Sequence, residues 1–420
     1  MTRRKLETRQ KLSLLNRGLI FCAAMLFVVV GVAGSATAQG SKYQFGERNL
    51  KKAAKAVEFL SAGDMTNAKV ELDKINLKRA KPYGRARVHS WLGQIAAQEE
   101  DFETSLFHFE KSIEEEALPP EEILRGLFQV GQLQTMLGQY DAAIVSLEKW
   151  ISTVETPAPS SYYTLAVTYY QAERPADALA PAKKAVELSD DPREAWYRLL
   201  LSLHLEREEY QEALALLDDI VLKYPNKAYW TQMAAIYSEL DQMGKSLAVQ
   251  QLASNEGYVT EDRDLTRLAQ MFMVEGLPHR GAAIMKKGLE EGTIEPTKTA
   301  YQTYSDTLLQ SREWKLAVEP LGKAAELHKD GSLFVRQAQV NLQIGDWEAA
   351  RSSLSRAFDK GGLADEGQAN ILFGIAAAND KKWAEALNAF GRAQNFEGTR
   401  TVAAKWMDYV AREKARLGVE

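Results

Sequence analysis

A repeated pattern of about 34 residues constrains this chain more than any other feature of its sequence. From about residue 86 onward, a helical segment is followed by a turn, an aromatic residue and a second helical segment with a small residue three positions after the aromatic. The clearest copies of the second half are GQYDAAIVSLEKW, EEYQEALALLDDI, REWKLAVEPLGKA, GDWEAARSSLSRA and KKWAEALNAFGRA. One such unit cannot bury its apolar surface alone, so the pattern predicts helix pairs that stack on their neighbours.

The small residue in each second helix sets the register of the repeat. Anchoring on it gives Ser105, Ala143, Ala178, Ala213, Leu247, Gly281, Ala317, Ala350 and Ala386. The steps from Ala178 to Ala386 average near 34 residues, which resembles the tetratricopeptide repeat (TPR). We therefore predict an all-α fold: a TPR-type α-solenoid, that is, a superhelix of antiparallel helix pairs, with about ten repeats and a C-terminal capping helix.

The chain is predicted to contain four segments. They are a signal peptide at 1–38, a degenerate N-terminal helical repeat at 39–85, the TPR solenoid at 86–396 and a C-terminal capping helix at 397–420. Pro181 and Pro320 each lie three residues after their anchor, inside a second helix, where proline removes a backbone hydrogen bond. Their matching positions indicate either an inherited duplication with tolerated kinks or a bend that shapes the groove.

The first 38 residues have the organisation of an export signal. A positively charged start precedes an apolar run from Leu19 to Val32, and small residues ending in A-x-A precede Gln39. We therefore expect cleavage before Gln39 and a periplasmic mature chain. The alternative is an uncleaved anchor, since Leu19 to Ala38 is about the length that spans a bilayer. Cys22 is the only cysteine and lies in this segment, so the mature chain is expected to have no disulfide and no thiolate ligand.

Charge and motif content exclude several classes of function. The formal net charge of −5 becomes more negative once the basic leader is removed, which argues against nucleic acid as a partner. Nucleophile-elbow, zinc-protease, P-loop and dinucleotide-binding spacings do not occur, and the five histidines are read as lying in different repeats. We therefore predict no enzymatic activity, no catalytic residue, no metal site, no cofactor and no bound small molecule.

The resemblance to TPR solenoids also implies a binding groove. In such solenoids the first helices line the concave side through positions 2, 5, 9 and 12 of each repeat. Mapped onto this sequence, the predicted groove for a peptide or partner is lined by Tyr163, Tyr170, Arg198, Tyr229, Gln232, Arg263, Gln270 and Gln302. These side chains offer aromatic faces and hydrogen-bond donors for an extended peptide. Alternatively, they are ordinary half-exposed helix residues and the partner binds elsewhere.

Several passages resemble one particular family. They are PREAWYRLLLSLHLEREEYQEALALLDDIVLKYPNKAYW, KKGLEEGTIE, EPLGKAAEL and TVAAKWMDYVAREKAR, and the resemblance covers roughly residues 120–417. The family is the periplasmic TPR protein found with some TonB, ExbB and ExbD energy-transduction systems.

This resemblance implies a non-enzymatic adaptor with TonB-, ExbB- or ExbD-like partners. Such an adaptor would associate peripherally with an inner-membrane complex and assist outer-membrane uptake of iron or siderophores. The alternative function is a chaperone-like periplasmic TPR protein that binds exported or outer-membrane polypeptides. Selective binding of one partner would favour the adaptor, whereas promiscuous binding of apolar peptides would favour the chaperone.

Overall fold

The structure is a computed structural model that describes residues 43–418 of the 420 in the chain. The described residues form 21 α-helices and one short 3₁₀ helix, and they contain no strand. The chain divides into two compact units, Met1–Glu208 and Glu209–Glu420, which are treated separately below. The predicted signal peptide lies outside the described residues, and within them no helix combines the length and apolarity needed to cross a bilayer.

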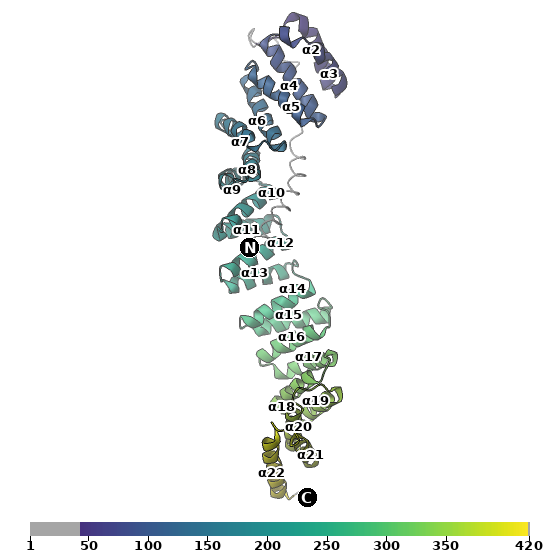
Figure 1. The fold of residues 1–420 in the computed structure, drawn as a ribbon. Coiled ribbons are helices and arrows are strands. Elements are labelled where there is room, and N and C mark those ends of the chain that lie inside the picture. The colour runs from purple at the N-terminus through teal and green to yellow at the C-terminus, as the bar shows by residue number, and fades with distance from the viewer. Residues whose placement is uncertain (1–42, 419–420) are drawn as a thin grey trace. The chain divides into compact units, whose positions relative to one another are not determined.

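In the first unit each α-helix contacts the next one along the chain (Figure 1). The helices are α2 (Glu47–Ser61), α3 (Met65–Asp73), η1 (Leu77–Arg79), α4 (Pro82–Gln98), α5 (Phe102–Glu114), α6 (Pro120–Met136), α7 (Tyr140–Thr153), α8 (Pro159–Gln171), α9 (Pro175–Glu187) and α10 (Glu194–Glu206). Prolines at the start of α4, α6, α8 and α9 suit a first helical turn, where no backbone N–H is needed.

Within the second unit, each helix likewise contacts the next one along the chain. Its helices are α11 (Tyr210–Lys223), α12 (Lys227–Glu239), α13 (Met243–Asn255), α14 (Asp262–Val274), α15 (Pro278–Glu291), α16 (Lys298–Gln310), α17 (Trp314–Leu327), α18 (Ser332–Ile344), α19 (Trp347–Lys360), α20 (Glu366–Asn379), α21 (Trp383–Ala393) and α22 (Arg400–Leu417). First helices also meet one another here, as α14 does with α16 and α18 with α20.

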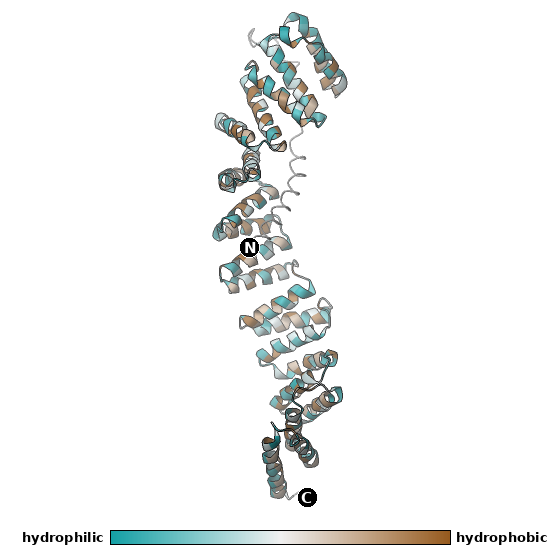
Figure 2. Ribbon diagram, in the orientation of Figure 1, coloured by the Kyte–Doolittle hydropathy of each residue, from teal (hydrophilic) through white to brown (hydrophobic). Residues whose placement is uncertain are grey.

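This arrangement confirms the predicted fold class. In chain order, first and second helices alternate from α2 to α21, and α22 follows as the C-terminal capping helix. Apolar and polar residues are interleaved along the helices (Figure 2), as expected where each helix buries one stripe against its neighbours. The chain is therefore an all-α solenoid of TPR type with about ten repeats.

Close packing at the anchor positions explains why small residues recur there. Ala143, Ala317 and Ala386 are completely buried. Across from Ala386, an added Cβ on Gly374 would lie 2.4 Å from the buried ring of Phe390. Larger side chains at these positions would push the two helices of a repeat apart, which is why the sequence period follows them.

One predicted anchor is wrong by one residue. The sequence pattern assigns Leu247, but the structure gives this position to Ser246, which is completely buried. The Ser246 hydroxyl donates a hydrogen bond to the carbonyl of Ala234 at 2.8 Å. Ser105 makes the same bond to Gly93, also at 2.8 Å, in an earlier repeat.

The turn between the paired helices supports this correction. A residue with positive φ stands five positions before each anchor, as Glu100 (φ 59°) does before Ser105. Asp241 (φ 57°) stands five positions before Ser246. Leu247 is also buried, which is why the hydrophobic pattern alone could not distinguish the two registers.

The two internal prolines and the capping helix lie where the sequence pattern predicts them. Pro181 is inside α9 and Pro320 is inside α17, and both are buried. Helix α22 packs on the last pair through Ala403 and Val410, and its Trp406 ring stacks on Phe390 with centroids 5.8 Å apart.

Candidate protein-binding surface

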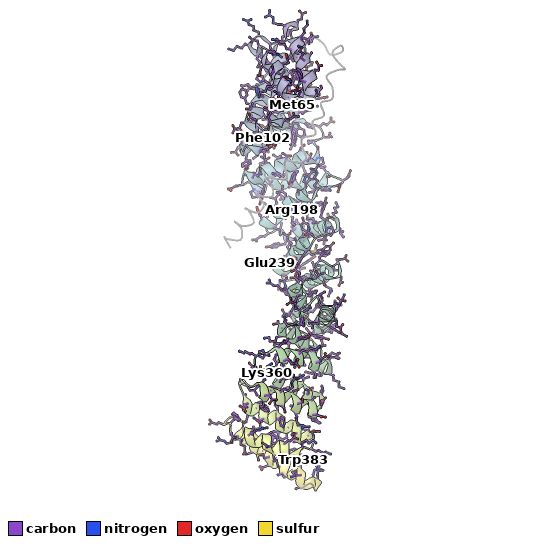
Figure 3. The ribbon with its side chains drawn as sticks, turned by 90° about the vertical axis from the view of Figure 1, so that its right-hand side faces the viewer. Met65, Phe102, Arg198, Glu239, Lys360 and Trp383 are labelled. Carbon is purple, nitrogen blue, oxygen red and sulfur yellow. The ribbon has the colours of Figure 1, made fainter. Side chains whose placement is uncertain are left out.

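In the first unit, the predicted groove residues lie on the first helices α8 and α10. The Tyr163 ring stacks on Trp196 with centroids 5.6 Å apart, and the Tyr170 hydroxyl donates to Glu206 at 2.9 Å. Burial raises the pKa of the Tyr163 hydroxyl, and the nearby positive charge of Arg198 opposes this shift. Arg198, labelled in Figure 3, is half-buried on α10. These side chains thus connect two adjacent first helices, with the aromatic pair partly covered.

In the second unit, a cleft lies between the first helices α14 and α16. We call it the α14–α16 cleft; its volume is about 370 Å³. Its lining residues all come from these two helices and the end of the loop that precedes α16: Asp262, Arg263, Thr266, Arg267, Gln270, Thr297, Thr299 and Ala300. Two of the predicted groove residues, Arg263 and Gln270, therefore lie together.

Hydrogen bonds hold the loop before α16 against α14. Asp262 accepts a bond from the Thr266 hydroxyl at 3.1 Å and another from the backbone N–H of Glu295 at 3.2 Å. Thr297 caps α16 by accepting the backbone N–H of Ala300 at 3.2 Å. The Asp262 carboxylate is thus engaged in fixing the backbone that forms one side of the cleft.

The acidic groups near the start of α14 are also engaged. Glu261 and Asp264 each pair with Lys227 of α12 at 2.7 Å. Hydrogen bonds to Asp264 and then to Glu261 raise the pKa of Lys227. Arg263 and Arg267 are exposed and make no ion pair within the described residues.

The α14–α16 cleft therefore presents positive charge and hydrogen-bond donors to solvent. Two guanidinium groups lie beside the Gln270 amide, whose Nε2 is 3.5 Å from the Thr303 hydroxyl. A guanidinium can hold a carboxylate through two parallel hydrogen bonds. The arrangement suits an acidic side chain or a terminal carboxylate of a bound polypeptide.

The structure does not bring the remaining predicted residues into this cleft. Gln302 is half-buried on α16 and is not among the lining residues. Only 6% of Tyr229 is exposed. Moving the anchor of this repeat to Ser246 shifts its groove positions by one residue, from Tyr229 and Gln232 to Ala228 and Thr231. The assignment of Tyr229 and Gln232 thus followed from the register error at Leu247.

The same positional rule contains two cleft residues that the prediction did not single out, Thr266 and Thr299, and a third, Arg267, lies just outside it. Thr266 occupies position 5 of its repeat, Thr299 occupies position 2 of the next, and Arg267 immediately follows position 5. The repeat register alone therefore leads to the two threonines but not to Arg267. The predicted groove contains only Tyr, Arg and Gln residues and therefore omits the threonines.

One histidine expectation is wrong. His89 of α4 and His108 of α5 belong to the same helix pair, and their Nδ1 atoms lie 2.9 Å apart. Burial lowers the pKa of both imidazoles. Within the described residues, no group of three or more His, Cys, Asp or Glu side chains is arranged to hold a metal ion.

Comparison with protein families gives two matches. Residues 136–220 match the family described as anaphase-promoting complex, cyclosome, subunit 3, and residues 335–398 match a tetratricopeptide-repeat family. A search of curated proteins finds no match.

Among solved structures, three similar chains are TPR proteins. YrrB, described as a TPR protein with an unusual peptide-binding site, is 16% identical with a TM-score of 0.35. The match covers 40% of this chain and 85% of the YrrB chain. A TPR protein from Parabacteroides merdae is 16% identical with a TM-score of 0.37, covering 71% and 100%. The C-terminal part of a TPR protein from Cytophaga hutchinsonii is 15% identical with a TM-score of 0.34, covering 67% and 99%.

Proposed function

We propose that this TPR solenoid is a non-enzymatic scaffold that binds partner polypeptides on its first helices and takes an acidic group of the partner in the α14–α16 cleft. The observation that carries the proposal is the pair Arg263 and Arg267, two exposed guanidiniums without an ion pair among the described residues. Nearby acids are already bound to Lys227 or to backbone N–H groups. The positive charge therefore remains available to a partner.

The energetic role of this cleft is specificity. Exposed charge pairs contribute little to stability in water, but complementary charges steer association and reject partners of the wrong sign. A solenoid supplies the remaining affinity through many weak contacts along its length. We therefore expect binding through this cleft to weaken as salt concentration rises.

At the level of the cell, the proposed scaffold is periplasmic and serves a TonB–ExbB–ExbD system for outer-membrane uptake of iron or siderophores. Two sequence observations support this: the export-signal pattern in residues 1–38 and the resemblance across residues 120–417. Its proposed partners are TonB-, ExbB- or ExbD-like chains, with peripheral association at the inner membrane.

Crosslinking in intact cells followed by affinity capture tests both parts of the proposal. We expect TonB- or ExbB-family proteins among the captured chains, and slower ferric-chelate uptake after deletion of the gene. The variant Arg263→Glu with Arg267→Glu should restore uptake poorly, whereas Lys287→Glu, an exposed charge reversal on the second helix α15, should restore it fully.

Two other results would redirect the proposal. Normal uptake in the deletion strain together with no such partner would overturn the role in a TonB system. Capture of many unrelated unfolded chains, insensitive to salt and to the Arg263 and Arg267 reversals, would favour the chaperone-like function instead.

A further inference from the structure

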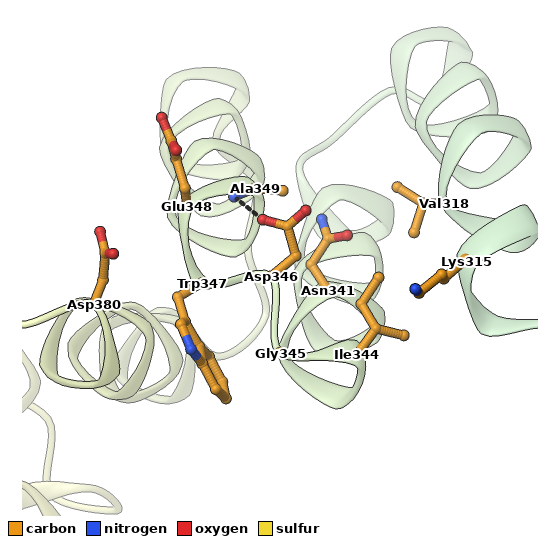
Figure 4. Close-up of a pocket in the computed structure, with 10 residues that line it drawn as sticks. All are labelled: Lys315, Val318, Asn341, Ile344, Gly345, Asp346, Trp347, Glu348, Ala349 and Asp380. Atoms are coloured by element: carbon orange, nitrogen blue, oxygen red, sulfur yellow. Dashed lines mark hydrogen bonds between the residues drawn. The ribbon is translucent and has the colours of Figure 1, made fainter.

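A second cleft in the second unit is not part of the surface described above. We call it the Trp347 cleft; it is open and has a volume of about 680 Å³. It is formed by helix α17, the end of α18 and the start of α19, and Asp380 lines one side of it (Figure 4). The residues that matter for its chemistry are Val318, Asn341, Ile344, Trp347, Glu348 and Asp380.

A chain of buried hydrogen bonds ends at this cleft. Gln337 Nε2 donates to the carbonyl of Val318 at 3.0 Å, and the Ser353 hydroxyl donates to Gln337 Oε1 at 3.0 Å. Asn341 Nδ2 then donates to Ser353 Oγ at 3.2 Å. We call Gln337, Ser353 and Asn341 the polar relay; each is at least nine-tenths buried.

The direction of the polar relay is fixed by its first bond. A backbone carbonyl can only accept, so Gln337 must turn its NH₂ group towards Val318 and its oxygen towards Ser353. The Ser353 proton is used on Gln337, so Asn341 must turn its NH₂ group towards Ser353. The relay thereby leaves the Asn341 oxygen as its free end.

The Asn341 oxygen has no hydrogen-bond partner within the described residues, although only 1% of the residue is exposed. Figure 4 places its amide between Asp346 and the side chains of Val318 and Lys315. A buried acceptor without a partner is costly and uncommon in folded proteins. A ligand for this cleft should therefore supply a hydrogen-bond donor.

The other lining residues indicate that this donor is positively charged. Asp346, which caps α19 through the Ala349 N–H at 3.0 Å, and Glu348 have no ion pair within the described residues. Asp380 pairs with Arg351 at 2.5 Å, and Lys315 is the only cationic side chain in the lining. The Trp347 ring lies apart from the Asn341 amide in Figure 4 and offers an aromatic surface to residues that flank the donor.

We infer that the Trp347 cleft binds an arginine side chain of a partner polypeptide. The guanidinium donates to the Asn341 oxygen next to Asp346, and the partner's flanking residues lie towards Trp347 and Glu348, which Figure 4 shows apart from Asn341. The cleft is larger than one side chain, so a short length of the partner's backbone also fits. This inference rests on the proposed function that the chain binds polypeptides, and it adds the chemistry of one contact.

The full chain can be titrated with acetyl-Gly-Arg-Gly-amide and with the matched peptide that carries citrulline, a neutral side chain of nearly the same shape. Indole N–H signals of the ¹⁵N-labelled protein report binding, and Trp347→Phe assigns the signal. We expect millimolar binding of the arginine peptide, at least tenfold tighter than that of the citrulline peptide, with a shift of the Trp347 signal.

Two variants test the assigned contacts. Asn341→Leu removes the free acceptor, together with the bond to Ser353, and should reduce the preference for the arginine peptide over the citrulline peptide at least tenfold, a ratio that a loss of stability alone would not change. Glu348→Gln should weaken binding severalfold and lies on an exposed position where folding is not at risk. Glu239→Gln, an exposed change on α12 outside the cleft, is the control.

Equal affinity for both peptides, or no shift of the Trp347 signal with either, would overturn the inference and leave water as the occupant of the cleft. Unchanged binding by both Asn341→Leu and Glu348→Gln would also overturn it. These outcomes leave partner capture through Arg263 and Arg267 intact, so the two proposals can fail independently.

Discussion

The two clefts of the second unit differ in charge although helices of the same repeat pattern build both. The α14–α16 cleft carries exposed guanidiniums at Arg263 and Arg267, whereas the Trp347 cleft carries carboxylates at Asp346 and Glu348. The repeat pattern requires small and apolar residues at its packing positions and leaves the positions between them free. Binding chemistry can therefore change from one repeat to the next without a change of fold.

The clefts also differ in how their polar groups are held. In the α14–α16 cleft, Arg263 and Gln270 lie on one helix at positions that a single rule predicts. In the Trp347 cleft, the free acceptor on Asn341 depends on bonds to Ser353 of α19 and, through it, to Gln337 of α18. Arg263 and Gln270 therefore depend on a single helix, whereas the free acceptor depends on how α18 packs against α19.

The largest expected effect comes from the scaffold that both clefts share. Ala317 on α17 is completely buried in a cluster with Ala282 and Leu308. Ala317→Glu should cost on the order of 3–5 kcal/mol of unfolding free energy, because it overpacks the site and buries an unpaired charge. Urea unfolding followed by circular dichroism measures this cost.

The neighbouring change Leu316→Glu is the matched control. Leu316 is 60% exposed on the same helix, so the new charge remains in water and the unfolding free energy should change little. Both clefts should lose their peptides in Ala317→Glu and keep them in Leu316→Glu. Loss of only one peptide in Ala317→Glu would mean that the clefts do not depend on a common core.

The second prediction separates the clefts by charge. Arg263→Glu with Arg267→Glu should weaken a glutamate-rich peptide at least about 30-fold, roughly 2 kcal/mol, because attraction becomes repulsion. The same variant should bind the arginine peptide as the native chain does. Isothermal titration calorimetry at two salt concentrations measures both peptides, with Lys287→Glu as the control; equal losses for both peptides would contradict separate sites.

The third prediction concerns the polar relay. Ser353→Ala leaves Gln337 Oε1 and Asn341 Nδ2 without their buried partner and should cost about 1–2 kcal/mol of unfolding free energy. It also releases the Asn341 amide to rotate, so the arginine peptide should bind more weakly while the glutamate-rich peptide is unaffected. Ser352→Ala, at the exposed neighbouring position, should change neither quantity.

Sequence alone could predict the fold and part of the α14–α16 cleft. The repeat period identifies the small anchor residues. Helix positions counted from a correct anchor then lead to Arg263 and Gln270. Counting failed where Ser246 and Leu247 are both buried, since hydrophobicity cannot choose between them. The resulting shift of one residue selected Tyr229, which the structure buries.

The Trp347 cleft could not be predicted from the sequence. Its free acceptor exists only because Gln337, Ser353 and Asn341 hydrogen-bond in a fixed direction across two helices. No spacing rule reports the direction of a side-chain amide. The proximity of His89 and His108 was missed for a related reason, because it depends on how α4 and α5 pack.

The smallest expected effect lies in the turns between paired helices of the second unit. Lys381 follows the cleft residue Asp380 and has φ 58°, whereas the equivalent residue in the turn between α14 and α15 is Gly276 with φ 75°. A left-handed conformation costs a side chain about 1–2 kcal/mol, partly offset by the entropy that glycine loses on folding.

We therefore expect Lys381→Gly to stabilise the second unit by about 0.5–1 kcal/mol and Gly276→Lys to destabilise it by a similar amount. Lys381→Gly also removes a positive charge beside Asp380, so the arginine peptide should bind slightly more tightly. Urea midpoints and peptide titrations of the two variants measure these changes together. If Lys381→Gly lowered the midpoint, the left-handed turn would owe its stability to the lysine side chain, and the two turns would not be equivalent.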